Sequence, residues 1–146
     1  MIIAAADPGL AGAFAVLDDR KGIATYPMPL MPGSGTRRLH DLDAQVDLIK
    51  GFGASLFAIE DVTRPAKLTR HQGFLIGVAL CAGIKVVHVR PQAWKAYFNL
   101  HRDGGTLKQF KGQSIAMARS RFGREFKTDG EAEAALIALF AKENAK

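Results

Sequence analysis

The chain opens on Ile2-Ile3-Ala4-Ala5-Ala6-Asp7-Pro8-Gly9, an apolar run that ends in an acidic residue and a turn. A short apolar run bounded by Pro and Gly predicts a buried strand over residues 2–7. Two more runs, 12–17 and 23–28, follow after short turns. Three strands joined by tight turns predict an antiparallel meander at the start of the fold.

Apolar residues continue to the end of the chain, either at helical spacing or in short runs. We expect helices over residues 42–52, 69–82, 91–98, 108–122 and 130–142, and strands over residues 56–60 and 84–89. Pro, Gly, Ser and Arg dominate residues 27–38, which predicts a flexible loop. The whole pattern predicts one α/β domain, residues 1–146, with a mixed five-stranded sheet flanked by helices.

The composition is that of a globular protein, with 48% apolar and 23% charged residues. No apolar run reaches the length of a membrane span, and no secretion signal precedes the first strand, so we expect a cytoplasmic protein. The single cysteine, Cys81, lies in an apolar stretch and is predicted to be a small buried side chain.

Positive charge is concentrated in one part of the chain. The net charge is +6, yet residues 63–124 hold twelve Lys and Arg residues and a single acid, Asp103. Such a stretch predicts a surface that binds phosphates. An anionic membrane is the alternative partner, but no amphipathic helix with Trp or Phe anchors supports it. We therefore expect a nucleic-acid partner and no membrane.

Four acidic residues stand at the ends of predicted elements. Asp7 and Glu60 each end a strand, and Asp129 and Glu133 lie four apart at the start of the last helix. If the two strands are neighbours, their carboxylates converge, and a four-residue spacing places two side chains on one helix face. Clustered carboxylates repel unless cations join them, and oxygen ligands suit Mg²⁺ or Mn²⁺. We expect catalytic metal ligands at these positions, with Glu131 as the alternative to Glu133.

Two such ions can activate a water and stabilise the leaving oxygen in phosphodiester hydrolysis. Each acid also has a local explanation. Asp7 suits a turn before Pro-Gly, Glu60 can pair with Arg64, and Asp129 can cap a helix. The joint occurrence of the acids beside a basic stretch favours catalysis over three unrelated local roles.

Five segments, in this order, resemble the RuvC-type Holliday junction resolvases, in particular the compact phage members. They are Ala6–Gly12, Ala58–Val62, Arg70–Gly73, Val89–Lys95 with its Pro-x-x-Trp-Lys pattern, and the acidic start of the last helix, residues 129–138. The resemblance implies a ribonuclease H-like fold. It also implies a homodimeric, divalent-metal endonuclease of DNA recombination and repair that nicks branched DNA such as four-way junctions.

The resemblance also implies residue roles. Asp7, Glu60, Asp129 and Glu133 match the family's catalytic, metal-binding acids. We expect DNA contacts from the basic residues Arg64, Lys67, Arg70, Lys95, Arg102, Lys108 and Lys111. Two departures stand out: Glu133 replaces a second aspartate, and Thr63 stands where bacterial members carry an aromatic residue. A relaxed, structure-directed nuclease is therefore the expectation.

Several alternatives stay open at this point. A nuclease of the same fold can act on RNA or an RNA–DNA hybrid, and a non-catalytic protein can bind branched DNA without cutting it. The apolar helix over 69–82 is a candidate dimer interface, or a helix buried on all sides in the monomer. Trp94 is expected in the core. His71, His88 and His101 can transfer protons, but we expect His88 to be structural and His101 to contact backbone phosphate.

Overall fold

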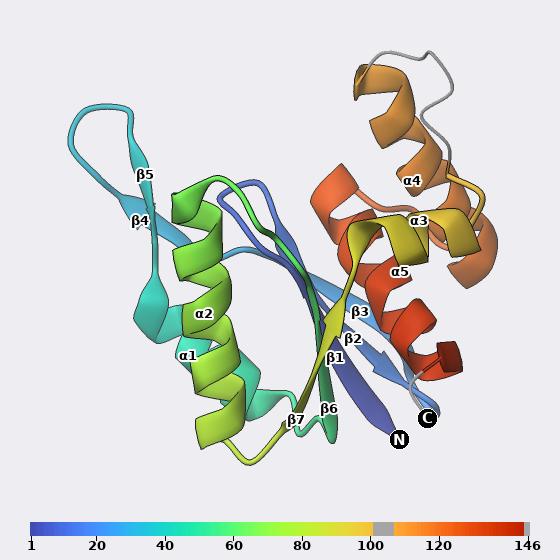
Figure 1. The fold of residues 1–146 in the computed structure, drawn as a ribbon, viewed down its shortest axis with the longest axis horizontal. Helices are drawn as coiled ribbons and strands as arrows, with labels where there is room; N and C mark the ends of the chain where they lie inside the picture. Colours follow the sequence, from blue (N-terminus) through green and yellow to red (C-terminus); the bar gives the residue numbers. More distant parts are fainter. Residues whose placement is uncertain (101–106, 145–146) are drawn as a thin grey trace.

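A single five-stranded sheet organises the molecule (Figure 1). The structure is a computed structural model that describes residues 1–100 and 107–144, with only the backbone of residues 107–111. The strand order is β3-β2-β1-β6-β7. The strands are β1 (Ile2–Asp7), β2 (Ala13–Asp18), β3 (Gly22–Pro27), β6 (Leu56–Glu60) and β7 (Lys85–Val89).

The first three strands form the predicted antiparallel meander, and the last two run parallel to β1. The expected mixed sheet is therefore confirmed. Strand β6 lies directly beside β1, with Ala6 opposite Ile59 in the register. Because both strands run the same way, their last residues reach the same edge of the sheet.

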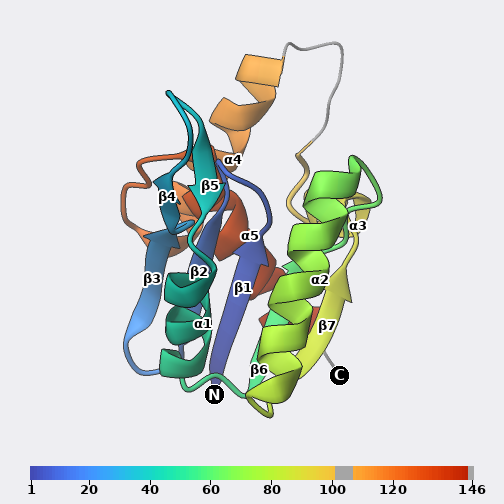
Figure 2. The ribbon, with the colours of Figure 1, turned by 90° about the vertical axis from the view of Figure 1, so that its left-hand side faces the viewer.

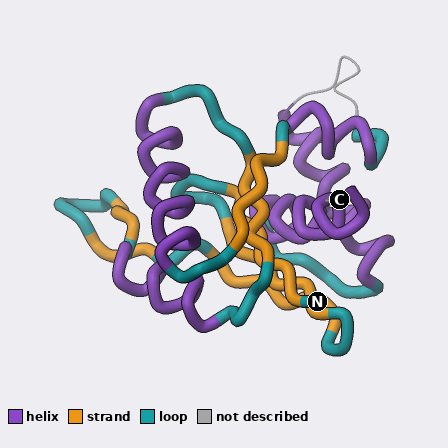
Figure 3. Tube along the Cα trace, turned by 60° about the horizontal axis from the view of Figure 1, so that its bottom comes forward, coloured by secondary structure: helices purple, strands orange, loops and turns teal. Residues whose placement is uncertain are grey.

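Helices cover both faces of the sheet (Figures 1 and 2). One face carries α1 (Leu42–Gly51) and α2 (Ala66–Cys81), and the other carries α3 (Pro91–Tyr97), α4 (Leu107–Phe122) and α5 (Asp129–Asn144). The tube in Figure 3 shows the strands as a layer between these two groups. All five expected helices are present, with bounds shifted by up to three residues.

Helix α5 packs centrally on its face of the sheet. Alanines dominate the contact on both sides: Ala5 and Ala15 on the strands, and Ala134, Ala135 and Ala138 on the helix, all fully buried. Small side chains allow close approach of helix and sheet at interior packing density. The acidic start of α5 is thereby fixed close to the sheet edge.

The segment expected as a flexible loop, residues 27–38, contains ordered structure. Strands β4 (Leu30–Pro32) and β5 (Arg38–His40) pair as a small separate hairpin. The Gly33 N–H donates to the Arg37 carbonyl at 2.8 Å and closes the turn. The loop prediction was wrong because three-residue strands give too little alternation to outweigh the Pro and Gly content.

Helix α2 is buried on one face only. His71, Gln72, Leu75 and Ala79 point into the molecule, whereas Leu80 is 58% exposed. The helix is therefore not buried on all sides in the monomer.

The exposed face of α2 corrects the prediction for Cys81. That thiol is exposed and lines a mostly apolar groove between α1 and α2 with Gly73, Phe74, Gly77 and Val78. The apolar run around Cys81 reflects this groove as well as the core. Over residues 1–100 and 107–144, no helix has the length and apolarity needed to cross a membrane.

Candidate active site

The predicted convergence of Asp7 and Glu60 occurs at the edge where β1 and β6 end. Asp7 is the last residue of β1 and Glu60 the last of β6, and the strands are parallel neighbours. Burial raises the pKa of the Asp7 carboxyl well above its usual value, and Glu133, Glu60 and Asp129 raise it further. All four predicted acids therefore lie within electrostatic range of one another.

Two glycines allow the close approach of the loop after Asp7 and the start of α5. A Cβ on Gly12 would overlap the Asp7 carbonyl oxygen. A Cβ on Gly130 would overlap the Ala11 carbonyl oxygen and lie 3.1 Å from the Gly12 Cα. Any larger side chain at either position would push the two segments apart. The Gly after Asp129 therefore sets the position of Asp129 itself.

The cap of α5 is Thr128, not Asp129. The Glu131 N–H donates to Thr128 Oγ1 at 3.2 Å, and the Lys127 N–H donates to Glu131 Oε2 at 2.9 Å. The first bond satisfies a helix N-terminal donor, and the second ties the Glu131 side chain back to the residue before the cap, which resembles a capping box. Glu131 is buried and occupied by this cap, so of the two candidates only Glu133 faces the acidic site.

An open pocket at the sheet edge collects these groups. It is lined by Asp7, Asp129 and Glu133, by Lys95, and by the turn residues 8–12 with Leu68. Three of the four predicted acids thus share a pocket with one predicted DNA-contacting lysine.

Glu60, the fourth acid, does not line this pocket, and its carboxylate contacts Trp94 and Lys95 next to it. The indole N–H of Trp94 donates to Glu60 Oε1 at 2.9 Å, and Lys95 Nζ lies 3.9 Å from the same oxygen. Trp94 is fully buried, which confirms the prediction of a core residue. Its second role, as a donor to Glu60, was missed, because helical spacing does not show which strand end an indole faces. The alternative pairing with Arg64 is not the one found.

Glu133 has its own donor on α4. The Ser114 hydroxyl donates to Glu133 Oε1 at 3.1 Å, and Ser114 is fully buried. Burial raises the pKa of the Glu133 carboxyl, and so do Glu60 and Asp129, whereas Lys95 and Ser114 lower it. Nothing in the sequence pointed to Ser114, which is a small polar residue within an amphipathic helix pattern.

The donor chemistry of the site fits a hard divalent cation. Four carboxylates supply only oxygen ligands, which Mg²⁺ and Mn²⁺ prefer. Within the described residues, no three Asp, Glu, His or Cys side chains converge on one point as they stand. Glu60 and Glu133 are turned onto Trp94 and Ser114. The residues fit the ion in charge and ligand type, and joint ligation requires the carboxylates to lie closer together than they stand here.

His71 supports the loop that follows Asp7, and both of its ring nitrogens are engaged. The Gly9 N–H donates to His71 Nδ1 at 3.2 Å, and His71 Nε2 lies 2.8 Å from Gln45 Oε1. Because Nδ1 accepts, the ring proton is on Nε2 and donates to Gln45. Burial, aided by His40, lowers the pKa of His71 to about 4. The ring is therefore neutral near pH 7, and both its nitrogens are engaged.

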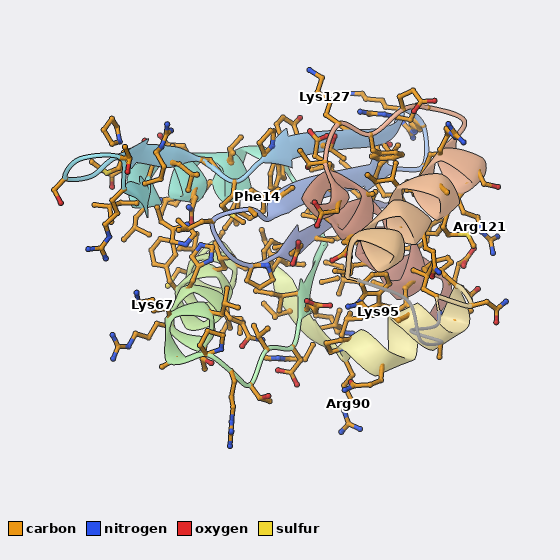
Figure 4. The ribbon with its side chains drawn as sticks, turned by 90° about the horizontal axis from the view of Figure 1, so that it is seen from above. Phe14, Lys67, Arg90, Lys95, Arg121 and Lys127 are labelled. Atoms are coloured by element: carbon orange, nitrogen blue, oxygen red, sulfur yellow. The ribbon has the colours of Figure 1, made fainter. Side chains whose placement is uncertain are left out.

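The basic residues predicted to contact DNA fall into three groups. Arg64, Lys67 and Arg70 are exposed at and just before the start of α2, and Lys95 lies in the pocket. Figure 4 looks down on this end, with Lys67 on α2 to one side and Lys95 on α3 to the other. Outside the described part of the chain lie Arg102, His101 and the side chains of Lys108 and Lys111.

His88, the third candidate histidine, lies on β7 outside the pocket. It is exposed, and its Nδ1 is 3.7 Å from Asp61 Oδ1. Proton transfer at the acidic site is therefore not a role this position supports.

Comparison with known proteins identifies the fold. No family model matches the sequence, and no curated protein matches it either. Solved structures do match over the full length. The fowlpox virus Holliday junction resolvase aligns with 15% identity, 100% of each chain covered and a TM-score of 0.67. The T. thermophilus RuvC in complex with a Holliday junction aligns with 16% identity, 99% of this chain and 97% of that chain covered, and a TM-score of 0.62.

The chain has the RuvC-like resolvase fold. A second fowlpox virus resolvase structure, in complex with substrate Holliday junction DNA, covers 99% of each chain at 15% identity and a TM-score of 0.64. The expected ribonuclease H-like architecture, with its mixed sheet flanked by helices, is thereby confirmed. At these identities the likeness concerns the fold, so residue roles depend on the geometry of the site.

Proposed function

We propose that this chain is a structure-selective endodeoxyribonuclease that cleaves Holliday junctions and other branched DNA by metal-assisted phosphodiester hydrolysis. One observation carries the proposal: acids from three distant segments, at 7, 60 and 129–133, meet at one sheet edge beside Lys95. Carboxylates that raise one another's pKa values favour cation capture, and perturbed acids in a pocket are characteristic of catalytic sites.

In this proposal Asp7, Glu60, Asp129 and Glu133 hold Mg²⁺, or Mn²⁺ in its place, with two ions per site. Bound ions would supply Lewis-acid activation of water and stabilise charge on the phosphate oxygens. The remaining roles belong to neighbouring side chains.

Three neighbours position the acids and the catalytic loop. Trp94 orients Glu60 through its indole N–H, Ser114 orients Glu133 through its hydroxyl, and His71 holds the loop after Asp7 through the Gly9 N–H. Hydrogen bonds to ligating carboxylates fix their orientation and tune metal affinity. Lys95 adds a cation where a scissile phosphate would lie.

The proposed DNA surface surrounds this pocket. Arg64, Lys67 and Arg70 lie at the start of α2 and supply exposed cations for backbone phosphates. Arg102, Lys108 and Lys111 remain proposed contacts on sequence grounds.

We propose a homodimer as the working unit. Its interface is the apolar groove of α2, where Gly73 and Gly77 leave room for a second helix. A two-fold dimer places two active sites on one junction, which gives symmetric nicks.

The test is cleavage of a synthetic four-way junction, with linear duplex and an RNA–DNA hybrid as competing substrates, with and without Mg²⁺. Glu60→Gln should lower junction cleavage by at least 100-fold. Asp61→Asn is the matched control, because Asp61 is adjacent but accepts from Gln72 instead of facing the pocket. If the protein cleaved the RNA–DNA hybrid in preference to the junction, the proposed substrate would be RNA rather than branched DNA. If the protein bound the junction without metal-dependent cleavage, it would be a non-catalytic branched-DNA-binding protein.

A further inference from the structure

The β4–β5 hairpin projects from the fold at the catalytic end of the sheet (Figures 1 and 2). Its tip rises at the end where β1 and β6 finish, next to the start of α2. Its three register pairs are Leu30 with His40, Met31 with Leu39, and Pro32 with Arg38. Side chains of directly opposed residues share a face, so this short ribbon has one inward and one outward face.

The inward face is anchored in the molecule. Leu30 packs against the apolar cluster beneath α1 and α2. The His40 ring stacks on the His71 ring with centroids 3.6 Å apart, and Gln45 Nε2 lies 3.1 Å from His40 Nδ1. Gln45 Nε2 also donates to the Pro29 carbonyl at 3.1 Å. The base of the hairpin is therefore fixed by a buried polar cluster.

The same cluster holds the catalytic loop. His71, on which His40 stacks, accepts the Gly9 N–H two residues after Asp7. One imidazole ring thus contacts both the hairpin and the backbone beside the acidic site. The hairpin has a defined position relative to the pocket, which a loosely attached loop would lack.

The outward face combines cations and exposed apolar groups. Met31 is 45% exposed and Leu39 is 40% exposed, as a directly opposed pair. Arg37, two residues before Leu39, is exposed on the same side at the tip. Arg38, opposite Pro32, is exposed at the tip on the other side, where its guanidinium lies 3.5 Å from the Leu30 carbonyl oxygen. No acidic residue occurs anywhere in residues 30–40. Arginine forks match phosphate oxygens, and Met and Leu are among the apolar side chains that pack against sugars and bases.

We propose that the outward face and the arginine-bearing tip of the β4–β5 hairpin form a DNA-contacting arm that binds the backbone of a duplex beside the catalytic pocket. Arg37 and Arg38 bind phosphates, and the Met31–Leu39 pair packs against the exposed sugar or base edge. The inference rests on the proposed DNA substrate and adds a surface on the α1 side of the pocket. With the cations at the start of α2, the arm widens the contact to several phosphates.

The test compares two variants that lose the same charge. Arg37→Gln with Arg38→Gln removes the arm's cations. Arg20→Gln with Lys21→Gln is the matched control, because that exposed turn joins β2 to β3 at the opposite end of the sheet. Junction affinity is measured by fluorescence anisotropy in chelator, where hydrolysis is blocked, over a series of salt concentrations. The arm variant should bind about tenfold more weakly, with a salt slope smaller by roughly 1–2, and the control within about twofold.

Two further measurements test the proposal even if the double arginine variant folds poorly. On the wild-type protein, bound junction should slow tryptic cleavage after Arg37 and Arg38 more than after Arg20 and Lys21. Met31→Ser with Leu39→Ser should weaken junction binding without changing the sedimentation coefficient.

The proposal would be overturned if the arm and control variants bound the junction with equal affinity. Equal protection of the hairpin and the β2–β3 turn from trypsin by bound junction would also overturn it. A changed sedimentation coefficient with unchanged DNA affinity would assign the face to a protein contact instead. Wild-type protein that binds junctions but cuts none would refute the nuclease, while the binding comparison would still decide the arm.

Discussion

His71 shows how a buried side chain can hold the loop that follows Asp7. Its ring accepts from Gly9, donates to Gln45 and stacks on His40. A neutral imidazole suits these contacts, because a protonated ring would lose its acceptor for the Gly9 N–H. The buried ring resists protonation, and its pKa falls to about 4. This residue therefore couples the order of the loop to pH.

The sign of that coupling gives a first prediction. Between the unfolded pKa near 6.5 and the folded value of about 4, the unfolded chain binds the extra proton. The contribution of His71 to the unfolding free energy is complete above pH 6.5 and is lost as pH falls towards 4. His71→Asn, whose amide oxygen can still accept from Gly9, should flatten this loss relative to wild type in denaturant titrations. His88→Asn, which removes an exposed imidazole, should follow the wild-type curve.

The contribution of Asp7 to the unfolding free energy depends on pH in the opposite direction. Its pKa is raised in the folded state, so the folded protein retains the proton to higher pH and the unfolding free energy falls as pH rises above about 4. In chelator at pH 7, Asp7→Asn should therefore stabilise the protein by about 1–2 kcal/mol, a few degrees in Tm. The exposed control Asp43→Asn should change Tm little. A destabilised Asp7→Asn protein would mean that the carboxylate repulsion is not there.

At the scale of elements, the site depends on the contact between the β1–β2 turn and the start of α5. Strand ends and helix starts could be predicted, because apolar runs and a four-residue acidic spacing place Asp7, Glu60 and Glu133. The donors Trp94 and Ser114 could not, since their partners lie on elements distant in sequence. The hairpin was missed because its strands are too short to show alternation.

Gly130→Ala tests that meeting point. The new Cβ would overlap the Ala11 carbonyl, so the helix start must shift away from the turn. We expect a loss of stability of about 1–3 kcal/mol and at least a tenfold loss of junction cleavage. Gly51→Ala at the end of α1, where no atom lies within 4 Å of the added Cβ, should leave both nearly unchanged. Wild-type cleavage by Gly130→Ala would show that the contact does not set the position of Asp129.

For the whole molecule, charge and apolar surface lie on different sides. The end of the sheet where β1 and β6 finish carries the basic residues of α2 and the hairpin, whereas the groove around Gly73, Gly77 and Cys81 presents apolar surface. The apolar sequence of α2 predicted either a dimer interface or a helix buried on all sides in the monomer. It could not separate burial in the monomer from an exposed interface, because both need apolar residues on more than one side.

The proposed dimer is tested at this scale. Cys81→Glu places a charge in the groove and should shift sedimentation from dimer to monomer at micromolar concentration. Leu42→Glu is the control, since Leu42 is 45% exposed on α1 and does not line the groove. Wild-type protein that sediments only as a monomer would contradict the dimer.

The central claim is that four acids from distant segments form one divalent-ion site, and manganese binding tests it most directly. Crystals soaked in Mn²⁺ should show anomalous density between Asp7, Glu60, Asp129 and Glu133. Crystals of Asp7→Asn soaked alike should show none. Manganese bound elsewhere, or a pocket that stays without manganese, would contradict the account.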